Sequence, residues 1–300
     1  MAKVNAGLPA PARQSLWEIV TGRSVIGFGI FALVLWGGYT TVNNAVDLGR
    51  TQGYAPDQPI KFSHETHAGI NEIDCQYCHD GARRSKHSVI PAANTCMNCH
   101  SVVKKGSEYG TSEISKIYAS IGYDPINNVY VEGRSEEEIK ANMKSWITTN
   151  FVADYNKANP DTPIDTTSAK ALAEFESQWN GITTSLKDDV DGKIEGPINW
   201  VRIHNLPDHA YFNHAQHVTV GKVECQTCHG PVEEMKVLAQ YAPLSMGWCV
   251  NCHRETEVSG FTENEYYKDY ELLHKEIKDG KRSGVTVEDL GGIECQKCHY

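Results

Sequence analysis

The sequence predicts a mostly α-helical protein with much irregular structure, in which an N-terminal transmembrane helix precedes a domain that contains two copies of one unit. Three observations support this fold class. Residues 24–46 carry no ionisable side chain. A Cys-x-x-Cys-His motif recurs five times and uses all ten cysteines. A Phe-x-His-x-x-His segment occurs twice, at 62–67 and 212–217, each time followed by two of these motifs.

The uncharged run 24–46 is 23 residues long, which matches the roughly 20 residues that a helix needs to cross a membrane. The flank before it carries three Lys or Arg residues against one acid, Glu18. The positive-inside rule therefore places the N-terminus in the cytoplasm and the rest of the chain outside. A cleaved signal peptide is the competing interpretation. Residues 39–43 make a poor small-x-small cleavage site, which favours a retained, single-pass anchor in the membrane lipid.

The Cys-x-x-Cys-His motif is the attachment signature of c-type haem, in which two thiols bond to the haem edge and the next histidine becomes the proximal iron ligand. Disulfides need no histidine after each pair, and five half-sites fit the closed tetrahedra of structural zinc poorly. The sequence therefore predicts five covalently bound haem c groups. The attachment residues are Cys75, Cys78, Cys96, Cys99, Cys225, Cys228, Cys249, Cys252, Cys295 and Cys298, and the proximal ligands are His79, His100, His229, His253 and His299.

Only 41 residues, Lys61–Ser101, carry the first two motifs. So short a segment cannot build an ordinary protein core, so we expect short helices and loops wrapped on haem faces. Haem c is attached outside the cytoplasmic membrane in bacteria. The predicted location is therefore the bacterial cytoplasmic membrane, with the haem domain on the periplasmic side.

The two Phe-x-His-x-x-His segments have identical offsets. His64 precedes Cys75 by 11 residues, and His214 precedes Cys225 by the same 11, which indicates a duplicated dihaem unit. A low-spin haem takes a second axial ligand, usually an imidazole or a thioether. Thirteen histidines less the five in the motifs leave eight candidates. The repeated offset selects four of them as predicted distal ligands: His64, His67, His214 and His217.

The repeated pattern resembles the class III multihaem cytochromes, the c3 and c7 families. The resemblance implies that the two histidines of each segment ligate different haems and that the first serves the motif that follows it. The second would serve another haem, most simply the next one. The implied pairs are His64 with His79, His67 with His100, His214 with His229, and His217 with His253.

The sequence leaves the fifth distal ligand open. His274 lies in 264–278, where Tyr266, Tyr270, Leu273 and Ile277 recur at helical spacing, so it is either a ligand of the C-terminal haem or a histidine at the edge of a core. His204 is the second candidate. Met246 is either a thioether ligand, which would raise that haem's potential, or a packing partner of Trp248. Weaker candidates are His87 and His209.

Between the two units, residues 102–199 contain neither cysteine nor histidine. Ser135 and Glu138 form a predicted capping box that opens a helix, and the segment 159–163 is a predicted loop before a second helix. We expect this spacer to serve as scaffold or partner contact. The residues predicted to face inward are Ile139, Met143, Trp146 and Ile147 on the first helix, and Leu172, Phe175, Trp179 and Ile182 on the second.

The formal net charge of −10 argues against nucleic acid as a partner. The predicted organisation has five parts. They are the cytoplasmic N-terminus and anchor at 1–50, the first dihaem unit at 51–101, the helical spacer at 102–199, the second dihaem unit at 200–257, and a C-terminal helix with the fifth haem site at 258–300.

The whole pattern is similar to the pentahaem cytochrome c subunit of alternative complex III, the membrane quinol–cytochrome c oxidoreductase. The anchor, both units, and the stretches 200–208, 246–249 and 291–295 carry this resemblance. It implies an iron–sulfur subunit, polytopic quinol-binding subunits and a monohaem cytochrome as partners. It also implies that quinol is oxidised on those subunits and that electrons leave to a soluble cytochrome or terminal oxidase. The long spacer departs from the compact pattern of that family.

Two other functions stay open. A stand-alone, membrane-anchored multihaem quinol dehydrogenase would share the anchor but lack the duplication. A multihaem catalytic reductase needs an iron with an open position, often with lysine in the proximal place, and the chain has no Cys-x-x-Cys-Lys motif. Because the haem performs the redox step and the protein supplies ligands and orientation, we expect no catalysis by the chain alone.

Overall fold

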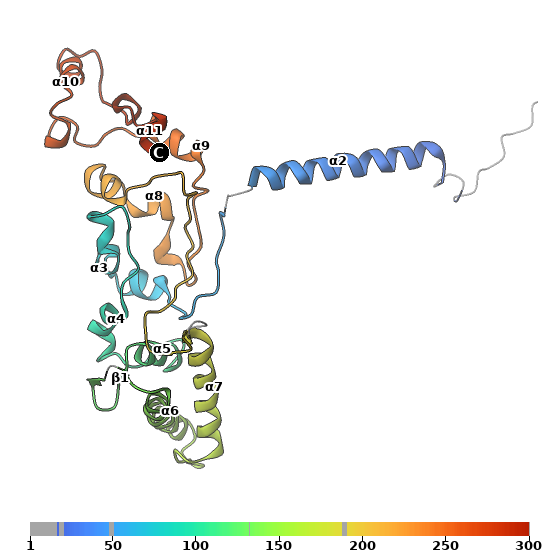
Figure 1. The fold of residues 1–300 in the computed structure, drawn as a ribbon, viewed down its shortest axis with the longest axis vertical. Coiled ribbons are helices and arrows are strands. Elements are labelled where there is room, and N and C mark those ends of the chain that lie inside the picture. The colour runs from blue at the N-terminus through green and yellow to red at the C-terminus, as the bar shows by residue number, and fades with distance from the viewer. Residues whose placement is uncertain (1–16, 18–20, 48–50, 132, 188–190, 300) are drawn as a thin grey trace, which may run out of the picture. The chain divides into compact units, whose positions relative to one another are not determined.

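The computed structural model describes residues 17, 21–47, 51–131, 133–187 and 191–299, and the chain divides into two units, 1–50 and 51–300 (Figure 1). The first unit contains helix α2, Arg23–Asp47. Its stretch Arg23–Ala45 has a mean hydropathy of 1.7 and is long and apolar enough to cross a membrane, a property that signal sequences share. The helix expected at 24–46 is therefore present.

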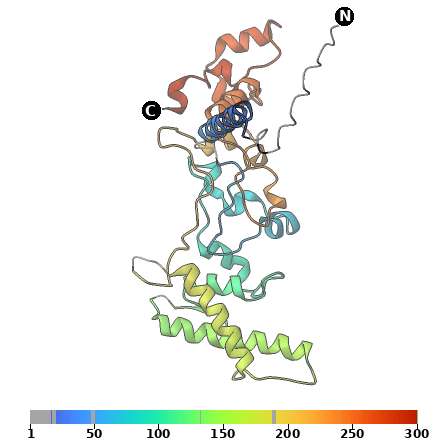
Figure 2. The ribbon, with the colours of Figure 1, turned by 90° about the vertical axis from the view of Figure 1, so that its right-hand side faces the viewer.

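The second unit is mostly helical, and many of its helices are short (Figures 1 and 2). The α-helices are α3 (Cys75–Cys78), α4 (Ala93–His100), α5 (Ser112–Ser120), α6 (Glu136–Ala158), α7 (Ala169–Leu186), α8 (Cys225–His229), α9 (Met246–Glu255), α10 (Glu271–Lys278) and α11 (Cys295–Cys298). The 3₁₀ and π segments are η1 (Glu65–Ile70), η2 (Asp80–Arg83), η3 (Gln216–Val220), η4 (Val232–Glu234), η5 (Glu265–Tyr267) and η6 (Glu288–Leu290). Strands β1 (Tyr123–Asp124) and β2 (Val129–Tyr130) pair antiparallel, with Tyr123 opposite Tyr130.

The largest apolar core lies among helices α5, α6 and α7 of the spacer. Helix α6 begins at the expected capping box, in which Ser135 Oγ accepts from the Glu138 backbone N–H at 3.3 Å and Glu138 Oε2 accepts from that of Ser135 at 3.1 Å. The predicted inward faces are confirmed, except that Leu172 is only half-buried. The buried residues are Ile139, Met143, Trp146, Ile147, Phe175, Trp179 and Ile182.

The second haem motif joins this core. Met97 of α4 is buried in it, and Cys96 packs against it. The Tyr118 hydroxyl of α5 donates to the carbonyl of His100 at 2.7 Å. Elsewhere in 61–101, Ala82 is the other buried apolar side chain. That scarcity agrees with the expectation that a non-protein group fills the apolar volume there.

The C-terminal segment departs from the helix expected over 264–278. The Asn264 side chain accepts from the Tyr266 backbone N–H at 3.0 Å, which starts the separate 3₁₀ turn η5. As a result Tyr266 is 56% exposed, whereas Tyr267 is 5% exposed and packs in a small core with Phe261 and Val285. The expected inward position of Tyr266 is therefore wrong, and the regular helix is limited to α10.

Candidate haem sites

Each Cys-x-x-Cys-His motif lies on a short helix or at its end. The helical spacing puts the two cysteines, three residues apart, on one face and the histidine beside them. Local capping fixes two of these helices, because Asp74 Oδ1 accepts from the Gln76 backbone N–H at 2.7 Å and Ser245 Oγ from that of Trp248 at 3.3 Å. All ten cysteines are free thiols in the structure, so the arrangement suits thioether attachment and includes no disulfide.

The five motif histidines share one feature, a partner for Nδ1. When Nδ1–H donates to a fixed acceptor, the tautomer and ring orientation are set and Nε2 is left for a metal. In four of them the partner is a backbone carbonyl, and in the fifth it is a side chain. The contacts are His79 with Val89 O at 2.7 Å, His100 with Val103 O at 2.7 Å, His253 with Gly292 O at 2.7 Å, His299 with His209 O at 3.1 Å, and His229 with His204 Nε2 at 3.3 Å.

The two Phe-x-His-x-x-His segments also have the same geometry. Phe62 stacks on His67 with centroids 4.3 Å apart, and Phe212 stacks on His217 at 4.4 Å. Each phenylalanine also meets the first histidine of its segment edge-on at 4.9 Å. The sequence repeat is therefore a structural repeat, which ends in a π-helical turn in both copies.

Three of these histidines lie opposite motif histidines at nearly one distance. A metal lies about 2 Å from a ligating imidazole nitrogen, and that nitrogen about 1 Å from the ring centre, so two axial rings should have centroids about 6 Å apart. The observed separations are 6.2 Å for His67 and His100, 6.0 Å for His217 and His253, and 6.5 Å for His214 and His229. Nδ1 of each of these three histidines also has a backbone carbonyl partner at 2.8 Å, which is Ser63 O for His67, Asn213 O for His217 and Lys86 O for His214. Both rings of each pair thus keep Nε2 for a metal.

His64 is the fourth predicted distal ligand, and its surroundings differ from those of the other three. Its Nδ1 is buried without a hydrogen-bond partner. Burial, together with the neighbouring His79 and His67, lowers the pKa of His64 to about 4. The pKa of His229 is also lowered to about 4. Burial is the largest cause, and the neighbouring His204, His214 and His79 add to it. Both imidazoles are therefore neutral at pH 7, which is the form that binds a metal.

The candidates for the fifth distal ligand fall in different environments. His274 stacks on Phe261 at 4.5 Å, much as His67 stacks on Phe62, but its Nε2 lies 3.0 Å from the Tyr267 carbonyl. His204 faces His229. Met246 is 71% exposed at the start of α9 and does not pack as a core residue. His87 is exposed.

His209 lies beside the C-terminal motif, a contact that sequence reasoning missed. Its ring centroid is 5.6 Å from that of His299, but its own carbonyl is the partner of His299 Nδ1. The carbonyl contact holds Nδ1 of His299 and leaves its Nε2 for a metal. No repeat signal marks this position, because Pro59 stands at the equivalent place in the first unit.

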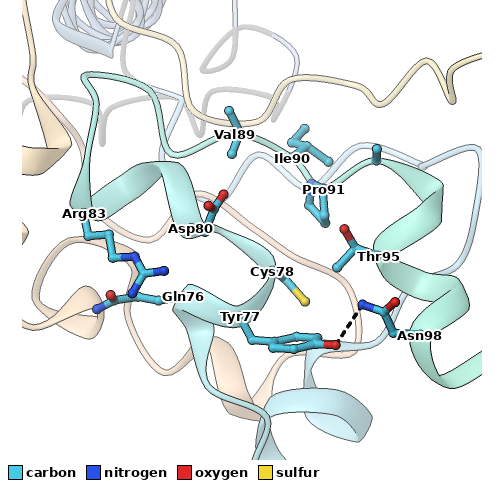
Figure 3. A pocket seen from close by; sticks show the side chains of 11 residues that line it. Gln76, Tyr77, Cys78, Asp80, Arg83, Val89, Ile90, Pro91, Thr95 and Asn98 are labelled. Carbon is cyan, nitrogen blue, oxygen red and sulfur yellow. Dashed lines mark hydrogen bonds between the residues drawn. The ribbon is translucent and has the colours of Figure 1, made fainter.

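A cavity of about 600 Å³ separates α3 from α4, and Cys78 lies in its lining (Figure 3). Tyr77 and Asn98 close one side, where the Asn98 amide donates to the Tyr77 hydroxyl at 3.0 Å. Ile90 and Pro91 line the other side. The volume and the attachment thiol suit a cofactor-sized group, so the residues present fit haem.

The five motifs follow one another in space, though not in chain order. The Asn98–Tyr77 bond joins the second motif to the first. The thiols of Cys75 and Cys225 are close enough that Cys75 contributes, after burial, to the raised pKa of Cys225, which joins the first motif to the third. Burial, then the neighbouring Cys252 and Cys249, raises the pKa of Cys228 to about 11. This neighbourhood joins the third motif to the fourth.

The fifth motif lies next to the fourth. The thiols of Cys249 and Cys298 are close enough that Cys298 contributes, after burial, to the raised pKa of Cys249. The contact of His253 with the Gly292 carbonyl ties the same two motifs together. The spatial order is therefore second, first, third, fourth and fifth, and the labelled helices α4, α3, α8 and α9 follow it (Figure 1).

These features are those of a multihaem c-type cytochrome, and the comparison with known families agrees with this class. Residues 43–121 match the class III cytochrome c family. The chain is thus mostly helical, carries a class III multihaem cytochrome domain, and has the electron-transfer role of a multihaem cytochrome c. The family implies covalently bound haem c.

A comparison with curated proteins adds one distant relative. The chain is similar to the multiheme cytochrome c subunit of menaquinone reductase from Nitratidesulfovibrio vulgaris. The two sequences are 20% identical over 243 residues, which cover 81% of this chain and 68% of the relative.

Proposed function

We propose that the chain is a membrane-anchored pentahaem c-type cytochrome that relays electrons within a respiratory membrane complex. The observation that carries this proposal is the set of five motif histidines, each with Nδ1 held by an acceptor and three with a second imidazole about 6 Å away. Haem c supplies reversible one-electron exchange when bound. The protein supplies the ligands, the burial and the positions.

The ligand set favours a relay over a catalytic reductase. We assign His64, His67, His214 and His217 as distal ligands of four haems. For the fifth we retain His274, because its stack on Phe261 matches the stacks that hold His67 and His217. To bind the iron, Nε2 of His274 would have to give up its contact with the Tyr267 carbonyl. Irons with two protein ligands offer no position for a substrate.

The order of the motifs supports a relay with two distinct ends. The second motif lies at one end, against the spacer core, and the fifth lies at the other. The first and third motifs occupy the middle, where the duplicated units meet. The bond from the Ala215 backbone N–H to the Ser85 carbonyl at 3.1 Å fixes that junction. We propose that electrons enter and leave at the ends of this row.

Helix α2 supports a single-pass anchor that holds the haem domain on the periplasmic side of a bacterial cytoplasmic membrane. The proposed partners are an iron–sulfur subunit, polytopic quinol-binding subunits, a monohaem cytochrome, and a soluble cytochrome or terminal oxidase as acceptor. In this arrangement quinol is oxidised on the partner subunits, as in alternative complex III.

A second candidate function reverses the direction of electron flow. The relative from N. vulgaris belongs, by its name, to a menaquinone reductase. In that case the chain would collect electrons from a periplasmic donor and deliver them to quinone-binding subunits in the membrane.

One purification tests the proposal and separates the two directions. The full chain with an affinity tag is purified from solubilised membranes of its native host, and co-purifying subunits are identified by mass. Menaquinol oxidation with a soluble cytochrome as acceptor would support the first function. Menaquinone reduction by a reduced periplasmic cytochrome would support the second. Quinol turnover by the isolated chain, with no partner subunits, would contradict both and favour the stand-alone dehydrogenase.

A further inference from the structure

We propose that His204 is a positioning residue that holds the proximal ligand of the third haem through a side-chain hydrogen bond and thereby sets the potential of that haem apart from the others. The inference rests on the proposed function, because it takes His229 as an iron ligand. It gives His204 a role different from that of a distal ligand.

The contact itself is specific. His204 Nε2 lies 3.3 Å from His229 Nδ1, with ring centroids 4.5 Å apart and ring planes at 84°. An iron between two imidazoles needs centroids about 6 Å apart, so no metal fits between these rings. His214 lies opposite His229 at 6.5 Å with nearly parallel planes, 8° apart. His229 therefore has a distal partner already, and its Nδ1 side is occupied by His204.

The third site differs from the other four in this respect. At the other four sites, Nδ1 of the motif histidine faces a backbone carbonyl, an acceptor that no side-chain substitution removes. At the third site the acceptor is an imidazole nitrogen. Hydrogen-bond partners of metal-bound histidines raise ligand basicity, and a more basic axial ligand favours the oxidised iron. Loss of this acceptor should therefore raise the potential of the third haem.

The segment around His204 holds it in place. Gln58 forms two hydrogen bonds with Val201, one to each backbone group, both at 2.9 Å. Ile203 is buried, and the Arg202 side chain donates to the His204 carbonyl at 3.0 Å. His204 is half-buried. The anchored backbone thus presents the ring to His229 from a segment 25 residues earlier in the chain.

The test compares His204→Leu with His204→Gln and with the control His87→Leu, each in the full-length chain. His87 is a suitable control because its side chain is exposed. Redox titration followed by optical and electron paramagnetic resonance spectroscopy resolves the individual haems, and intact mass counts them. We expect His204→Leu to keep five low-spin haems while one reduction step moves to higher potential and four stay in place.

The conservative variant, the control and three contrary outcomes complete the test. The glutamine of His204→Gln offers an amide oxygen as acceptor, so the potential of this variant should lie between those of the parent and His204→Leu, whereas His87→Leu should match the parent protein. A high-spin haem that binds carbon monoxide in His204→Leu would overturn the inference and make His204 an axial ligand. Five unchanged potentials would overturn it too. A parent chain with fewer than five haems would instead refute the proposed function.

Discussion

Replacement of His217 with alanine removes one distal imidazole and leaves every thioether intact. The ring centroids of His217 and His253 lie 6.0 Å apart, and the Asn213 carbonyl holds Nδ1 of His217, which leaves Nε2 for the proposed fourth haem iron. We expect the variant to keep five haems, one of which turns high-spin and binds carbon monoxide. The low-spin signal should fall by about one fifth, because one of five irons loses an axial ligand.

The structure also indicates that this variant will fold. The substitution loses the stack on Phe212, whose centroid lies 4.4 Å from that of His217. Such a pair contributes about 1 kcal/mol, which is small beside a total stability of roughly 5–15 kcal/mol. His217→Met would keep a ligand, restore the low-spin state and raise the potential of that haem.

The assay is carbon monoxide difference spectroscopy of the reduced protein, with electron paramagnetic resonance of the oxidised protein. His87→Ala is the matched control, because that side chain is exposed. One bound carbon monoxide per His217→Ala chain and none for the control would support the assignment. Five low-spin haems in His217→Ala would refute the reasoning from ring separation, and with it the pairs at His67 and His214.

Three further predictions concern the fifth ligand, the anchor and the spacer. His274→Ala should turn the C-terminal haem alone high-spin; if His274→Ala leaves all five haems low-spin while Met246→Ala or His204→Ala does not, the assignment of His274 fails. Replacement of residues 1–46 with a cleavable export signal should release a soluble domain that still carries haem, since Arg23–Ala45 is the membrane-length apolar helix among the described residues; a truncated protein that remains in the membrane fraction after a salt wash would contradict this. Ile147→Ala should destabilise the domain by about 2–5 kcal/mol, because Ile147 is fully buried, whereas Ser135→Ala should cost about 1 kcal/mol; chemical denaturation monitored by Trp fluorescence measures both, and equal effects would refute the ranking.

Local signals in the sequence were sufficient for part of the fold. The capping box at Ser135 and Glu138 and the buried faces of α6 and α7 depend on residues three or four apart, and the structure confirms them. The helix expected around Tyr266 failed for an equally local reason. The Asn264 side chain caps a tight turn, which competes with a continuous helix.

The haem sites depend on contacts that no local pattern records. The motif spacing predicts the attachment residues, but the order of the motifs follows from neighbours far apart in sequence, such as Cys75 and Cys225. The partner of His229 comes from a different segment, and the acceptor for His299 is a backbone carbonyl 90 residues away. Any residue type can supply a backbone carbonyl, so the sequence does not mark such an acceptor. The contacts of His204 with His229 and of His209 with His299 therefore could not be deduced from sequence.

The central claim is that the chain binds five haem c groups, one at each motif. The most direct test is intact mass spectrometry of the full chain, purified from a host that attaches haem c, together with the same measurement after Cys295→Ala and Cys298→Ala are introduced together. The account predicts a mass increase of five haems for the parent chain and four for the double variant. Four or fewer haems on the parent chain, or an unchanged count in the variant, would contradict it.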